Sequence, residues 1–191
     1  MIRKIRLPRP LRRFLGDETG SMIVEAVLVM PMMAWAAFAL FVYWDAYATI
    51  NRVQKATYTV ADVLSRSRTN IDSTDAFGVE RLFNFTLPGD TAVRMRLTSA
   101  VFSDRNNRFE VQWSCALDPV NMPALTTATL QQFSDRLPLT ADADTLMIVE
   151  TQYDFTPIFD VGLNDMTLGQ FVATRPRFIP SVGFTDPGNC R

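Results

Sequence analysis

The sequence of 191 residues contains no histidine, and this absence excludes several kinds of chemistry. Ser-His-Asp and Cys-His catalysis both use an imidazole as the general base, and many zinc sites use one as a ligand. Cysteine is also scarce, because Cys115 and Cys190 are the only two and no C-x-x-C motif is present. Two thiols cannot build a four-thiolate metal site, and without that motif they are not a thioredoxin-like redox pair. We therefore expect no metal, no cofactor and no catalytic residue.

Two carboxylates, Asp142 and Asp144, are the nearest approach to a catalytic pair. They flank Ala143 immediately before an apolar run. This position favours a solvent-exposed cap at the start of a strand, and no phosphate-binding loop, nucleophile motif or metal-ligating cluster accompanies them. The sequence therefore predicts that the protein is not an enzyme.

Charges of the two signs nearly balance, and the formal net charge is −1. Nucleic-acid-binding domains are usually basic, so this balance predicts no nucleic-acid partner. The balance hides an asymmetry, because the first 20 residues hold six basic and two acidic side chains, whereas the remainder has 13 basic and 18 acidic residues and a net charge of −5. The six basic residues are Arg3, Lys4, Arg6, Arg9, Arg12 and Arg13.

Charge is absent from one long segment, the 19 residues 26–44. As an α-helix this segment would span roughly 28 Å, close to the hydrocarbon thickness of a bilayer. It is longer than the apolar region of a cleaved secretory signal, and a further helical pattern follows it. The segment therefore predicts a retained transmembrane helix.

The basic residues before this helix predict its orientation. Positive flanks stay on the cytoplasmic side, so residues 45–191 should lie in the periplasm, outside the cytoplasmic (inner) membrane. Pro31 removes a backbone donor and crowds the preceding turn, so we expect a kink near residues 27–31. Tyr43 and Trp44 fit an aromatic belt at the outer interface, whereas Trp35 falls inside the span.

Glu25 is the one charge within the apolar stretch. A carboxylate at the centre of a membrane helix costs about 2.5–3.5 kcal/mol on insertion scales, and less near an edge. Either Glu25 extends to the cytoplasmic interface, or it finds a positive partner. A cut after Gly20 would free an α-ammonium at Ser21, about one helical turn from Glu25. In an uncut chain, Gly20 would form a turn and Ser21 would be the helix N-cap.

The stretch RRFLGDETGSMIVEAVLVMPMM, residues 12–33, resembles the processing region of type IV pilin-like proteins. More specifically, it resembles the TadE/TadF-like pseudopilins of the tight-adherence (Tad, Flp) pilus. The shared pattern is a basic leader, Gly20, four residues, Glu25 and an apolar helix with an early proline, Pro31. YTVADVLSR, residues 58–66, is similar to the segment that follows the membrane helix in TadF-like members. The resemblance is specific over roughly residues 10–66.

This resemblance implies a minor pilin or pseudopilin that acts by membrane insertion and subunit packing, without chemical turnover. A prepilin peptidase would cut between Gly20 and Ser21, and Glu25 would pair with the freed amine of the same or an adjacent subunit. The expected partners are the peptidase, other pilin or pseudopilin subunits, inner-membrane assembly proteins and the lipid bilayer.

One residue departs from the family pattern. Major pilins of this system usually have an aromatic residue directly after the glutamate, where this chain has Ala26. Either the peptidase tolerates Ala26, or the chain is not cut. An uncut chain would be a single-pass, membrane-anchored periplasmic binding or scaffold module, such as an adhesin.

The helical pattern continues beyond the membrane, because no Gly or Pro occurs between Met32 and Arg68. A heptad-like seam would pack either on this chain's own outer domain or on another subunit. Asp62 and Arg66 form a favourable i,i+4 pair. The seam comprises Ala46, Ile50, Val53, Thr57, Val60 and Leu64. The chain thus divides into a basic cytoplasmic leader (1–20), a transmembrane helix (21–44), an outward extension of that helix (45–68) and a periplasmic α+β domain (69–191).

Alternating apolar and polar residues predict a small antiparallel sheet in this last part. Residues 93–101 and 109–115 form a hairpin with one buried face, residues 145–155 a third strand and residues 171–178 a fourth. Short helices are expected at 75–85 and 125–136, and Pro88-Gly89-Asp90 is a turn. The predicted fold class is α+β, a long N-terminal transmembrane helix packed on a small antiparallel sheet, as in pilins.

The two cysteines suit a disulfide. Cys115 ends the second strand on its apolar face, and Cys190 lies in a C-terminal tail that would otherwise fray. An oxidising compartment outside the cytoplasm permits the bond, which would contribute roughly 4 kcal/mol on the chain-entropy model. Two free buried thiols are the alternative.

Overall fold

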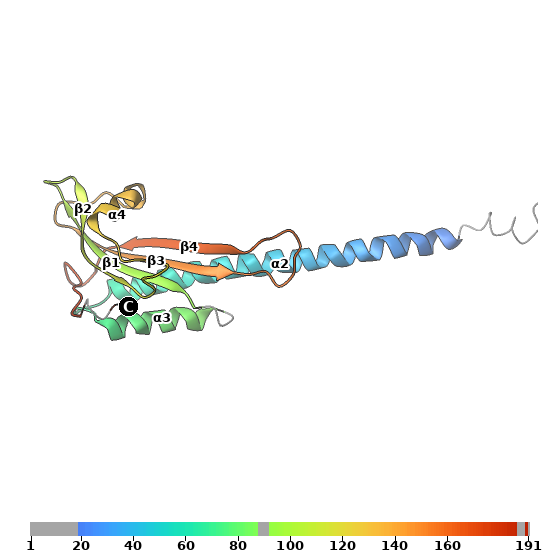
Figure 1. Cartoon of the computed structure of the whole chain (residues 1–191), viewed down its shortest axis with the longest axis horizontal. Helices are drawn as coiled ribbons and strands as arrows, with labels where there is room; N and C mark the ends of the chain where they lie inside the picture. Colours follow the sequence, from blue (N-terminus) through green and yellow to red (C-terminus); the bar gives the residue numbers. More distant parts are fainter. Residues whose placement is uncertain (1–18, 88–91, 187–189, 191) are drawn as a thin grey trace, which may run out of the picture.

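In the computed structural model, one long helix carries a four-stranded antiparallel sheet on its C-terminal half (Figure 1). The structure describes residues 19–87, 92–186 and 190. The α+β class, the long apolar N-terminal helix and the antiparallel sheet are confirmed. The leader before residue 19 and the predicted turn at Pro88-Gly89-Asp90 lie outside the described residues.

The long helix, α2, comprises the 47 residues Thr19–Ser65. The C-terminal tail contacts the end of this helix. There, the carbonyl oxygen of Ser65 accepts a hydrogen bond from the backbone N–H of Arg177 at 2.8 Å. The predicted Asp62–Arg66 ion pair is present at 2.9 Å, and Asp62 also pairs with Arg177 at 3.2 Å. The tail thus satisfies a carbonyl group that the end of the helix leaves free.

Helix α3, Ser73–Thr86, confirms the short helix expected at 75–85. A capping box starts it: the N–H of Asp75 donates to the side chain of Asp72 at 2.9 Å, and the N–H of Asp72 donates to the side chain of Asp75 at 3.2 Å. One face, with Ala76, Val79 and Phe83, is buried against α2 and the sheet.

The sheet contains β1 (Arg94–Ser103), β2 (Arg108–Ala116), β3 (Thr145–Phe155) and β4 (Met166–Thr174). The strand order is β2-β1-β3-β4, and every neighbouring pair is antiparallel. Figure 1 shows β3 and β4 running alongside the C-terminal half of α2. The sheet therefore lies along the helix rather than across its end.

The predicted seam of α2 packs on the protein's own sheet. Five of its six residues are buried, and Ile50 is half-buried. They share one core with α3 and with residues of β1 and β3 such as Leu97 and Val149. Within that core, the hydroxyl groups of Thr57 and Thr151 lie 2.8 Å apart, and Thr57 also donates to the carbonyl oxygen of Val53. Of the two partners considered, the seam therefore uses its own domain.

The prediction that the hairpin buries only one face is wrong. In β1, residues 95–100 are all buried, so both faces of the strand are covered. A second core lies on the face opposite α2, beneath α4 (Thr127–Leu130) and the 3₁₀-helix η1 (Gln131–Arg136). Its buried members are Ala100, Phe109, Leu125, Leu130, Leu146 and Ile148. The apolar run of β3 explains this layer, since strands covered on both sides carry apolar residues at consecutive positions.

A β-bulge changes which residues of β2 face the helix. The register shifts between Ser99 and Ala100, which pair with Trp113 and Val111 respectively, so the residue between those two is extra. Simple alternation along residues 109–115 predicts Phe109, Val111, Trp113 and Cys115 on one face. The structure instead puts Trp113 and Cys115 against the helix-side core, and Phe109 and Val111 against the second core. A bulge has this effect because one extra residue reverses the period-two alternation.

The fourth strand begins earlier than predicted. It comprises Met166–Thr174 rather than residues 171–178. Pro176 has no backbone N–H and so cannot continue the ladder, which explains why the strand ends before it. The tail then runs back to the start of α3, where Ile71 and Phe184 form an isolated bridge.

Candidate membrane-anchoring segment

The N-terminal half of α2 is the candidate functional segment, because no large part of the described chain covers it. All residues from 22 to 41 are exposed except Ala39, which is half-buried. This is a 20-residue stretch and thus about 30 Å of helix, matching the hydrocarbon core of a bilayer. Large apolar side chains point in every direction around it: Met22, Ile23, Val24, Val27, Leu28, Val29, Met30, Met32, Met33, Trp35, Phe38, Leu40 and Phe41.

This segment is the one helix, among the described residues, that is long and apolar enough to cross a membrane. A helix that packs in a soluble core is covered by its neighbours, and a surface helix is apolar on one side only. Residues 22–41 fit neither description, because they are apolar all round and uncovered. By length and apolarity, residues 22–41 are therefore a candidate membrane anchor, and this segment is called the anchor from here on.

Glu25 lies at the N-terminal end of the anchor, three residues after Met22 and therefore about 4.5 Å inside it. Its side chain is exposed. Gly20 has open space around the position of a Cβ atom. Helix α2 as described already includes Thr19 and Gly20, so Ser21 has helical backbone and is not the N-cap of the uncut alternative.

Pro31 lies inside α2, whose assignment continues through it without interruption. The kink near residues 27–31 stays a prediction.

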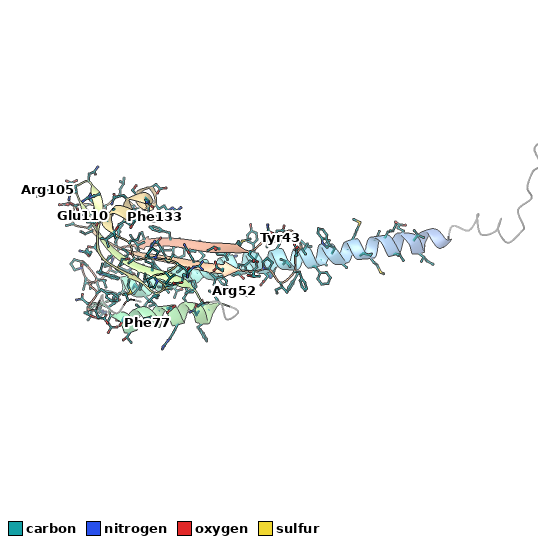
Figure 2. All side chains as sticks on the ribbon, in the orientation of Figure 1. Tyr43, Arg52, Phe77, Arg105, Glu110 and Phe133 are labelled. Atoms are coloured by element: carbon teal, nitrogen blue, oxygen red, sulfur yellow. A yellow bond between two sulfur atoms is a disulfide. The ribbon has the colours of Figure 1, made fainter. Side chains whose placement is uncertain are left out.

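The anchor meets the domain at Val42, the first buried residue of α2, followed by Ala46. The opposite side of the same turns stays exposed and aromatic, with Tyr43, Trp44 and Tyr47 (Figure 2 labels Tyr43). A shallow hollow there is lined by Leu40, Tyr43, Trp44, Tyr47, Ala48 and Asn51. Aromatic side chains at the end of an apolar helix suit a membrane–water interface.

The predicted disulfide between Cys115 and Cys190 is present, with the two cysteines 75 residues apart in sequence. It joins the end of β2 to the tail, which other contacts also hold. The indole N–H of Trp113 donates to the carbonyl oxygen of Val182 at 2.8 Å, and the N–H of Ile71 donates to that of Gly183 at 3.0 Å. Both cysteines are thus bonded, and neither is a free thiol.

Sequence patterns missed a buried ion pair on the other face of the sheet. Arg96 and Glu150 are direct cross-strand partners, and Arg96 Nε donates to a carboxylate oxygen of Glu150 at 2.7 Å. Arg96 also donates to the carbonyl oxygen of Pro123. Burial raises the pKa of Glu150, and the Arg96 guanidinium opposes this only in part. The sequence feature that could have revealed this pair is one basic and one acidic residue in the two central strands, β1 and β3, on the face of the sheet away from α2.

This pair lines a hollow of about 210 Å³ beside η1, together with Arg136, Phe133 and Phe171. Arg136 lies over the ring of Phe133, which stacks on Phe171 at 5.6 Å. Glu150 is thus already paired with Arg96, and the arrangement joins β1 to β3 by a buried ion pair.

Asp142 and Asp144 hold the far end of the sheet. Asp142 accepts the N–H of Asp104 at 2.8 Å, and Asp144 pairs with Arg175 at 2.9 Å. These bonds tie the β1–β2 turn and the tail to the start of β3. In the part of the chain that the structure describes, no group of three or more Cys, Asp or Glu side chains is arranged to hold a metal ion.

Comparisons of the chain with known protein families, curated proteins and solved structures found no match.

Proposed function

We propose that the chain is a membrane-anchored minor pilin or pseudopilin of the TadE/TadF-like type, which serves in assembly of a tight-adherence pilus. The observation that carries this proposal is the anchor itself: 20 uncovered residues, apolar on all sides, with one carboxylate near the N-terminal end. The C-terminal half of the same helix packs against the sheet and α3 of a domain that, in this proposal, lies in the periplasm. Assembly subunits of this kind work by insertion and packing.

The lone carboxylate is central to the proposal. Glu25 lies about 4.5 Å inside the anchor. Its side chain must therefore either extend back to the water interface or pair with a cation within the hydrocarbon. A prepilin peptidase cutting between Gly20 and Ser21 would create that cation. The α-ammonium of Ser21 lies four residues from Glu25, and i,i+4 positions are neighbours on one helix face. The amine of an adjacent subunit is the second source.

The outer half of α2 leaves room for such an adjacent subunit. Its buried stripe is occupied by the sheet, while Trp44, Tyr47 and Tyr58 on the other side remain between 55% and 75% exposed. Aromatic residues are enriched at protein interfaces. In this proposal, other pilin or pseudopilin subunits and inner-membrane assembly proteins contact this exposed side.

Mass spectrometry of the N-terminus tests the processing step. In cells that contain the peptidase, the membrane-extracted protein should begin at Ser21. An intact Met1 terminus, in cells that process their other pilins, would favour the alternative, an uncut single-pass periplasmic binding or scaffold module.

The charge-pairing step needs its own variants. Glu25→Ala should still be cut but should fail to co-purify with partner subunits. A matched double variant, Glu25→Ala with Ala26→Glu, keeps the composition and rotates the carboxylate by about 100° around the helix. This variant should also fail to co-purify with partner subunits, because the acid then faces away from the Ser21 amine. Normal assembly by both variants would count against the pairing role.

A further inference from the structure

The connection between β3 and β4 lies beside the anchor rather than at the far end of the domain. β3 ends at Phe155 and β4 begins at Met166, and the connection between them reaches α2 where the helix leaves the sheet (Figure 1). The ring of Phe159, in this connection, lies 5.6 Å from the ring of Phe38 on α2. The chain therefore places a loop at the level of Phe38.

Phe38 belongs to the anchor. It precedes Phe41, the last residue of the uncovered stretch, by three positions, or about 4.5 Å along the helix. When residues 22–41 fill the hydrocarbon core, Phe38 lies just inside its outer edge. The polar headgroup layer outside that edge is about 5–7 Å thick on each side. A loop that touches Phe38 therefore reaches through the headgroup layer.

The side chains of this loop suit such a position. Ile158 and Phe159 are consecutive and remain 64% and 47% exposed, although both are large and apolar. They continue the apolar surface of the anchor through the Phe38 contact. The next residue, Asp160, is exposed, and an ionised side chain at this depth can stay in the headgroup layer. The loop thus has an apolar tip of two residues with a charged flank.

We propose that Ile158 and Phe159 form a second membrane contact, inserted at the outer interface of the bilayer that α2 spans. This inference rests on the proposed role of α2 as a membrane anchor. The occupant of the surface is lipid, because the surface is continuous with the anchor and lies at its depth. Two contacts, one on the helix and one on the loop, prevent the domain from tilting freely on its anchor.

Site-directed spin labelling of the full chain in phosphatidylcholine vesicles tests this contact. Cys115 and Cys190 are bonded to each other, so a single added thiol takes the label. The test position is Ile158→Cys. Leu28→Cys, 67% exposed on the anchor, is the lipid reference, and Arg105→Cys, at the opposite end of the domain in Figure 2, is the water reference. The measurement is the ratio of collision rates with oxygen and with a polar nickel chelate.

The expected ratio at position 158 is severalfold higher than at position 105 and lower than at position 28, which lies deeper in the hydrocarbon. A ratio at 158 equal to that at 105, with 28 shielded from the chelate, would overturn the loop contact and leave the anchor intact. Exposure of position 28 to the chelate would overturn the anchor itself and this inference with it. Spin–spin broadening at 158 that disappears on dilution with unlabelled chain would place a second copy there instead of lipid, which also overturns the inference.

Discussion

Removing the Cys115–Cys190 disulfide should cost the domain a large part of its stability. The bond closes a loop of 75 residues, which contains β3 and β4. On the chain-entropy model, cross-linking a loop of that length destabilises the unfolded state by about 4.5 kcal/mol at 25 °C. Since a domain is typically stable by only about 5–15 kcal/mol, the loss is a major fraction of the total.

The perturbation is the double variant Cys115→Ala/Cys190→Ala, measured in full-length protein in detergent micelles by urea unfolding. Trp113 is a suitable reporter because its ring lies 4.9 Å from that of Phe184 in the tail. Trp35 and Trp44, on the exposed side of α2, are replaced by Phe in every sample. With a slope of about 2 kcal/mol per molar urea, the unfolding midpoint should fall by about 2 M.

Reduction of the otherwise unchanged protein is the matched control. Cys115 is 1% exposed, so alanine there also leaves a small void, whereas reduction breaks the cross-link and keeps both sulfur atoms. The two treatments should give the same loss to within about 1 kcal/mol, because the void is small. A midpoint that moves by less than about 0.5 M after reduction would refute the reasoning, since most of the stability would then be independent of the cross-link.

Two further variants test the two faces of the sheet. Thr57→Val leaves the buried hydroxyl of Thr151 without its partner and should lower the free energy of unfolding, measured in urea, by about 1–3 kcal/mol. The double variant Thr57→Val/Thr151→Val should recover part of this loss. If the losses of the two single variants simply add in the double variant, the shared hydrogen bond is contradicted. On the other face, burial raises the pKa of Glu150, so the stability linked to this group is fully present below its ordinary pKa and is lost as the pH rises through the raised value. Glu150→Gln does not titrate, so its free energy of unfolding, relative to that of the unchanged protein, should rise as the pH goes from acid towards neutral. A difference that is independent of pH would contradict the raised pKa.

The periodic parts of the fold could be predicted from the sequence. The uncharged run and the seam that follows it predict α2, and the short helix expected at 75–85 lies within α3. β3 is predicted residue for residue, because Met147, Val149 and Thr151 alternate in register with the helix face. These features depend on local spacing, which the sequence displays directly.

The remaining features depend on pairing between distant segments. The bulge opposite Ser99 and Ala100 is a property of two strands together, so alternation within β2 alone could not reveal it. The Arg96–Glu150 pair requires the register of β1 and β3. To predict that Phe159 lies beside Phe38, one must know how far β3 extends along α2. None of these relations is encoded within a single stretch of chain.

The alignment of α2 with β3 and β4 has a mechanical consequence. The buried stripe of the helix, from Val42 to Ser65, runs along the strands for about 35 Å rather than ending on them. A force that pulls the anchor out along its axis would load the whole stripe in shear, so many contacts would have to slip at once. The tail bond from Arg177 to Ser65 closes the distal end of the same stripe. A helix held in this way resists extraction as a single body, because its turns cannot detach one after another.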